Sequence, residues 1–178
     1  MRCARRGVEA LLVALKAHGG IVASLLDENA PSGLDDRPGP AQIAATGPRA
    51  AAAADEYELL LEMILEGSHL HYGPQRAVRT ADPDLALLIG DQLYALGLAR
   101  LAAMADLAAV LELADVISLV AEAHAASDPA LAAAVWESGA VAIGWGADER
   151  HSAAKELART ADPRAASALR EAATAASS

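Results

Sequence analysis

The chain has 178 residues, of which 54% are hydrophobic, 21% charged and 3% aromatic, and its formal net charge at pH 7 is −10. This length suits one domain with a real core, and the apolar fraction is too high for a disordered chain. Because an acidic surface repels phosphate backbones and anionic headgroups, the composition argues against general binding to nucleic acids or anionic membranes.

Alanine dominates the sequence, phenylalanine is absent, and apolar and polar residues do not alternate with period 2 over any useful length. Alanine loses no side-chain entropy when a helix forms, so it is the best helix former. We therefore predict an all-α protein, a bundle of about seven helices that forms a single domain over residues 1–178.

The first third of the chain predicts a helix over 4–26, which Gly19 and Gly20 kink or split. Residues 29–48 contain four prolines and three glycines, which predicts a flexible loop or one that a partner orders. A second helix is predicted over 50–66, and a loop over 67–79.

Later helix starts are marked by aspartate followed by proline, at 82, 128 and 162, and by Asp106. Aspartate accepts a hydrogen bond from a free backbone N–H at a helix start, and proline is tolerated at the first helical position. The predicted helices are 82–104, 106–125, 128–143, 148–160 and 162–175.

Two of these helices, 82–104 and 106–125, are apolar on almost every side. Such helices need cover from several directions, so we expect them at the centre of the bundle or in a subunit interface. The C-terminal helices within 148–178 are amphipathic and expected to be more exposed.

Targeting segments are not expected. Glu9, Lys16 and His18 interrupt the stretch that follows the N-terminal arginines, which argues against a signal peptide. No window of about 18 apolar residues is free of charge, so we expect no transmembrane segment. A single cysteine, Cys3, excludes an internal disulfide framework, and together these features favour a cytoplasmic protein.

The strongest candidate for a functional site is a row of glutamates, Glu58, Glu62 and Glu66, followed by His69 and His71. Carboxylates four residues apart lie on one helix face and can share a divalent cation such as Mg²⁺. Two basic residues of the next segment are candidates to contact a diphosphate: Arg76 and Arg79. The alternative is that the glutamates form a solvated face and the histidines belong to a surface loop.

Asp91 is predicted to be a buried structural carboxylate, because apolar residues surround it in the sequence. A buried carboxylate must be paired, hydrogen-bonded or protonated. We expect its partner to be an arginine, a histidine or the backbone at the end of another helix.

The segment Leu85 to Leu98, LALLIGDQLYALGL, and its continuation to Glu122 resemble the trans-isoprenyl diphosphate synthases, the polyprenyl synthetase family. Tyr57 to Glu66 is similar to the helix that carries that family's first aspartate-rich motif. The resemblance implies an isoprenyl-synthase-like helical bundle with a dimer-type helix interface. Both aspartate-rich motifs and the basic Gly-Lys-Arg segment are missing, as in the family's non-catalytic small subunits, so catalysis is not expected.

Three functions remain open. The first is an interaction or regulatory subunit, either a homodimer or a partner of a catalytic subunit in a hetero-oligomer. The second is a Mg²⁺-dependent prenyltransferase, or a protein that binds prenyl diphosphate or another lipid ligand, with Glu62 and Glu66 on the cation. The third is a small α-helical adaptor.

Overall fold

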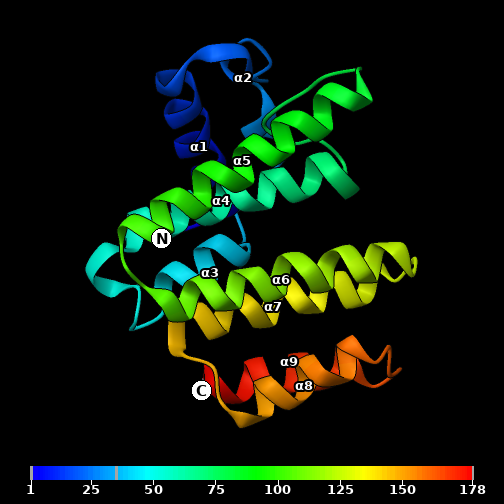
Figure 1. Cartoon of the computed structure of the whole chain (residues 1–178). Coiled ribbons are helices and arrows are strands. Elements are labelled where there is room, and N and C mark those ends of the chain that lie inside the picture. The colour runs from blue at the N-terminus through cyan, green and yellow to red at the C-terminus, as the bar shows by residue number, and fades with distance from the viewer. Residues whose placement is uncertain (1, 35, 178) are drawn as a thin grey trace. The chain divides into compact units, whose positions relative to one another are not determined.

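The computed structural model describes residues 2–34 and 36–177, and all regular secondary structure in these ranges is helical. The all-α class is therefore confirmed, with more helices than the seven expected. The described elements are α1 (Ala4–His18), α2 (Gly20–Ser24), η1 (Ala30–Gly33), α3 (Pro40–Thr46), η2 (Ala51–Ala53), α4 (Ala54–Tyr72), α5 (Pro83–Ala103), α6 (Leu107–Ala125), α7 (Pro129–Trp145), α8 (Glu149–Arg159) and α9 (Ala165–Ala176). They are labelled in Figure 1.

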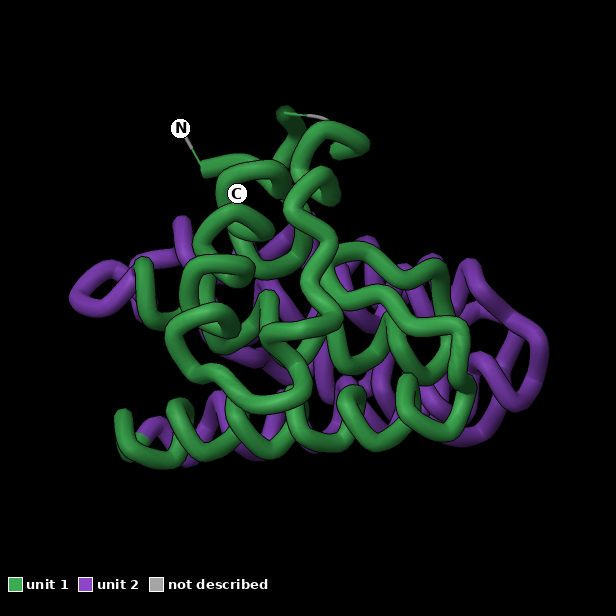
Figure 2. The backbone as a smooth tube through the Cα atoms, turned by 90° about the horizontal axis from the view of Figure 1, so that it is seen from above, with its two compact units in different colours: residues 1–42, 55–105 green, residues 43–54, 106–178 purple. Residues whose placement is uncertain are grey.

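The chain forms two compact units, which Figure 2 shows in different colours. The first unit contains residues 1–42 and 55–105, and the second contains 43–54 and 106–178. The prediction of a single domain is not tested by this division and stays a prediction.

Helix α4 is the most buried helix of the first unit. From Tyr57 to Ser68, every residue except Leu59 is buried. Apolar side chains from four other segments complete the core around its Met63 and Leu70. They are Val8, Leu11, Leu15 and Val22 of α1 and α2, Ala77 and Val78 of the segment after α4, and Ala86, Ile89 and Leu93 of α5.

Helix α5 packs against α4 but is not the central helix that its composition predicts. Leu88 is 66% exposed and Leu87 44% exposed. Of the two places predicted for this helix, the centre of the bundle does not fit its exposed side, and a place in a subunit interface stays a prediction. The burial of α4 was not predicted, because its glutamates were assumed to face water. By length and composition, α5 is also the one described helix that would suffice to cross a membrane, although a third of its apolar window is buried.

In the second unit the most buried helix is α7, which contacts α6 and α9. Figure 1 shows α7 running along α6, with α8 and α9 beyond it. Helix α6, predicted to be central, leaves Leu107 74% exposed and Leu111 71% exposed. One side of α6 is thus packed and the opposite side is not.

The helix starts follow the predicted chemistry at three positions. The side chains of Asp82, Asp106 and Asp128 each accept a hydrogen bond from a backbone N–H of the helix that follows. Asp148 does the same for α8. Oδ1 of Asp162 accepts a hydrogen bond from the backbone N–H of Arg164 at 2.8 Å, but the α-helix begins only at residue 165.

Two predicted loops contain helices. Residues 29–48 include η1 and α3, and α4 continues through residues expected to form a loop, as far as Tyr72. The split in the first helix is confirmed, because Gly19 and Gly20 have φ values of 77° and 70°, which glycine adopts without strain.

Gly47 lies against the backbone of α7, and this contact leads to a stability prediction. A Cβ at position 47 would lie 2.3 Å from the carbonyl carbon and oxygen of Gly144, and backbone cannot move aside as a side-chain tip can. We expect Gly47→Ala to destabilise the chain by about 2–3 kcal/mol in urea denaturation. Gly33→Ala is the control, because nothing lies within 4 Å of its Cβ position. Equal stability of the two variants would contradict the contact.

Candidate functional site

The glutamate row on α4 is buried. Glu58, Glu62 and Glu66 are 8%, 1% and 0% exposed, so the interpretation as a solvated face was wrong. Their spacing of four residues places them on one side of the helix, as expected. That side faces other segments of the first unit, which supply a polar partner to each carboxylate.

The positively charged partner of Glu62 and Glu66 is Arg76. Its Nη2 donates to Oε2 of Glu62 at 2.9 Å, and its Nε donates to Oε2 of Glu66 at 3.0 Å. The second oxygen of Glu66, Oε1, accepts the backbone N–H groups of Ala77 at 2.8 Å and Val78 at 3.0 Å. Burial disfavours the charged guanidinium, but the two carboxylates outweigh it and raise the pKa of Arg76.

Gln42 of α3 links the glutamates to one another. Its Nε2 donates to Oε1 of Glu58 at 3.0 Å and to Oε1 of Glu62 at 2.9 Å. Arg2 binds the other oxygen of Glu58. Both oxygens of Glu62 and both oxygens of Glu66 therefore have a protein partner. The position between the two carboxylates, where a metal ion would bind, is occupied by the guanidinium of Arg76.

Arg79, the second basic residue predicted to contact a diphosphate, is also paired. Its Nε lies 2.5 Å from Oδ2 of Asp27, and its side chain is 62% exposed. Arg76 and Arg79 thus each neutralise carboxylates of the first unit. The prediction that they contact a diphosphate is not tested by these contacts and stays a prediction.

His71 and Asp91 lie where α4 and α5 meet. The His71 ring stacks on Tyr94, with 5.3 Å between centroids and 7° between planes. Its Nε2 lies 3.1 Å from Oδ1 of Asp91, a close polar contact without hydrogen-bond alignment. His69 is half-buried on the last turn of α4. Burial raises the pKa of Tyr94 to about 12, against the opposing effect of a hydrogen bond with Ser68.

Asp91 corrects one sequence prediction. Its side chain is 70% exposed, so it is not a buried carboxylate, although its partner is a histidine. The residues described hold no group of three or more His, Cys, Asp or Glu side chains arranged to bind a metal ion. The structure does not bring Glu62 and Glu66 together with His69 and His71 as one ligand set.

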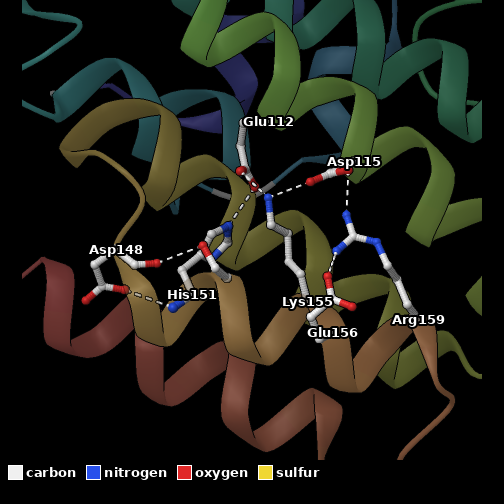
Figure 3. Close-up of polar contacts among 8 residues, drawn as sticks. Glu112, Asp115, Asp148, His151, Lys155, Glu156 and Arg159 are labelled. Carbon is white, nitrogen blue, oxygen red and sulfur yellow. Dashed lines mark hydrogen bonds and ion pairs between the residues drawn. The ribbon is translucent and has the colours of Figure 1, made fainter.

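A second polar cluster, in the second unit, was not predicted (Figure 3). Oε1 of Glu112 lies 2.7 Å from Nε2 of His151, and its Oε2 accepts from Nζ of Lys155 at 2.7 Å. Lys155 also donates to Asp115 at 2.6 Å, and Arg159 donates to Asp115 at 2.7 Å. These hydrogen bonds and ion pairs connect α8 with α6.

The spacing of this cluster was visible in the sequence. On α8, His151, Lys155 and Arg159 are four residues apart, and on α6 the two acids are three apart, so each set shares one helix face. Burial would raise the pKa of Glu112, but His151 and Lys155 outweigh it and lower that pKa below its ordinary value. Glu112 and His151 are 6% and 5% exposed, whereas the outer members, Asp115 and Arg159, are partly exposed. The polar network is therefore buried at its Glu112 end only.

The first unit also has open hollows on its surface. One of them, along α1, has a volume of about 570 Å³, and its lining includes Leu12, Val13 and Leu26 and the charged side chains of Arg5 and Lys16. Lys16 is paired with Glu28 at 2.8 Å and Arg5 with Asp36 at 3.1 Å. No member of the Glu62–Arg76–Glu66 group lines this hollow.

Because the carboxylates of Glu62 and Glu66 are occupied, we expect magnesium to leave the stability unchanged. A ligand that binds only the folded state raises the melting temperature, and we expect a shift below about 1 °C at millimolar Mg²⁺. The measurement is a thermal-shift titration with MgCl₂ against NaCl of equal ionic strength. A saturable rise that the Glu62→Gln variant abolishes would contradict this expectation.

Comparison with protein-family models, with curated proteins and with solved structures found no match for this chain.

Proposed function

We propose that this protein works by association, as a non-catalytic helical subunit that packs one or more of its exposed apolar helix faces against another chain. The observation that carries the proposal is the exposed side of α6. Leu107 and Leu111 lie one turn apart and are 74% and 71% exposed, although the opposite side of the same helix is fully packed. Contiguous exposed apolar residues on a folded surface are typical of interaction sites.

Helix α5 supports the same proposal. Its exposed residues include Leu87 and Leu88 near its start and Ala95, Ala99 and Ala102 further along. A helix face of this kind, with large residues at one end and small residues at the other, admits a second helix at close range. The exposed charged residues of α5 are Asp84 in its first turn and Asp91.

The chemistry of the glutamate row also favours an interaction subunit over an enzyme. Glu62 and Glu66, which would have to hold magnesium, instead hold Arg76 in a buried ion pair. The resemblance of 57–124 to the isoprenyl diphosphate synthases, without either aspartate-rich motif, suits a degenerate subunit of that kind. Without those carboxylates, the charge that develops on a leaving diphosphate has no metal to neutralise it.

Light scattering with size-exclusion chromatography tests the proposal. We expect the chain, or its complex with a co-purified partner, to have a mass well above 18.2 kDa. The double variant Leu107→Asp/Leu111→Asp is expected to dissociate, because a carboxylate cannot be buried unpaired in an apolar interface. Val13→Asp on α1 is the matched control, since Val13 is 70% exposed on a different helix.

The proposal fails if the wild-type chain is a monomer of 18.2 kDa at all concentrations and no partner co-purifies with it. It also fails if the control variant dissociates as readily as the double variant. Circular dichroism on both variants shows whether each is folded, so that loss of association is separated from unfolding.

A further inference from the structure

Helix α6 has two apolar seams, one on each side. The buried seam, which packs inside the second unit, consists of Ala109, Leu113, Val116, Val120 and Ala123. The exposed seam consists of Leu107, Leu111, Ala114, Ser118, Ala121 and Ala125, of which only Ala121 is half-buried. Spacings that alternate between four and three residues along a whole helix are the pattern of a helix-pairing seam.

The exposed seam of α6 has no charged residue over its whole length. A partner recognised by charge, such as a basic peptide, therefore has no anchor on the seam itself. The seam is also asymmetric along its length, because both leucines lie at its N-terminal end and only small residues follow them. This asymmetry determines which kind of helix fits it.

We propose that the partner is a second copy of this chain, and that the two α6 helices pack antiparallel through the exposed seam. The proposal deepens the proposed function and rests on it. Around a two-fold axis level with residue 116, three pairs form at once: Leu107 opposite Ala125, Leu111 opposite Ala121, and Ala114 opposite Ser118. Each leucine meets a small residue of the other copy, so the same surface is its own complement.

The charges of α6 suit this register. Two copies that each carry a net charge of −10 pair only where acidic residues do not face one another. In the antiparallel register Glu122 lies opposite Val110, and Asp115 lies opposite Ile117. The antiparallel direction also sets the positive end of each helix dipole beside the negative end of the other.

The size of the seam indicates a weak dimer. Nineteen residues at 1.5 Å each make α6 about 28 Å long, and a strip about 10 Å wide on both copies buries about 600 Å² in total. Stable dimers bury about 1,200–2,000 Å². We therefore expect a concentration-dependent dimer with a dissociation constant in the micromolar range, which sedimentation velocity over a hundredfold concentration range detects.

Site-directed disulfides test the register. Cys3 is buried and is first replaced by alanine to leave a thiol-free chain. Leu107→Cys and Ala125→Cys are then made separately, mixed and oxidised with copper phenanthroline. We expect a disulfide-linked dimer from the mixture and little from either variant alone, because in this register residue 107 of one copy lies about 27 Å along the axis from residue 107 of the other.

The controls separate the two proposals. Val13→Cys mixed with Ala125→Cys is expected to give no linked dimer, and Leu111→Asp is expected to weaken dimerisation at least tenfold while the circular dichroism stays unchanged. Linkage of Leu107→Cys to itself would overturn the antiparallel register. A dimer by sedimentation without the 107–125 disulfide would overturn the register and leave the proposed function standing. A monomer throughout, with no co-purifying partner, would overturn both.

Discussion

Replacing Arg76 with alanine is expected to destabilise the chain by about 3–5 kcal/mol, because it leaves two buried carboxylates without their counter-ion. Glu62 and Glu66 are 1% and 0% exposed, so solvent screens these ion pairs very little. Urea denaturation followed by circular dichroism measures the loss. The expected result is a lower midpoint with an unchanged slope, since the folded chain buries the same surface.

Arg79→Ala is the matched control for Arg76→Ala. It removes the same side chain three residues away in the same segment, but Arg79 is 62% exposed and pairs with a single carboxylate, Asp27. Exposed ion pairs contribute about 0–1 kcal/mol, so we expect a loss of less than about 1 kcal/mol. Equal losses for the two variants would show that the Glu62–Arg76–Glu66 group does not act as a buried ion network.

The helical class and most helix starts could be predicted from the sequence because they depend on local chemistry. Alanine favours helix wherever it stands, and the aspartate side chains at 82, 106 and 128 accept hydrogen bonds from backbone two or three residues away. The predicted end of α4, at residue 66, was wrong because Gly67 does not stop the helix, which continues to the residue before Gly73. A Gly67 within a helix is tolerated where it meets another backbone, here the carbonyl oxygen of Gly90.

The burial of each helix could not be predicted in the same way, because it depends on contacts far apart in the sequence. The glutamates of α4 look like a solvated face until Gln42 and Arg76 are placed against them. Conversely, the apolar sequence of α5 does not indicate which side of that helix stays exposed to solvent. Periodicity gives the faces of a helix, but only the partners decide which face is inside.

The same difference between local contacts and contacts far apart in the sequence applies to the predicted site residues. The pairing of Glu62 with Glu66 was predicted from their spacing, but the identity of the cation was not, since Arg76 follows a helix end that the sequence did not place correctly. The cluster around Glu112 was missed because two helices some 40 residues apart each hold half of it. A search for matching charge spacings on different helices would have found it.

Replacing Glu112 with alanine is expected to cost about 3 kcal/mol at neutral pH, because His151 and Lys155 lose their shared buried acceptor. Glu122→Ala, at an exposed position of the same helix, is the control and is expected to cost less than about 0.5 kcal/mol. Urea denaturation at several pH values provides the measurement for both variants.

The difference in stability between the wild type and Glu112→Ala is expected to depend on pH in a defined direction. Despite its burial, Glu112 has a pKa below its ordinary value of 4.5, because His151 and Lys155 favour the carboxylate. The folded state thus binds a proton less readily than the unfolded state, so the contribution of Glu112 is complete above about pH 4.5 and is lost as the pH falls through the lower, folded-state pKa. The pKa of Lys155 is raised above 10.5, since its two carboxylate partners outweigh its burial, and its contribution is lost only as the pH rises beyond that value. We therefore expect the difference to decline on acidification below about pH 4.5. A difference that stays constant through the acid range would mean that the charge of Glu112 does not hold α8 against α6.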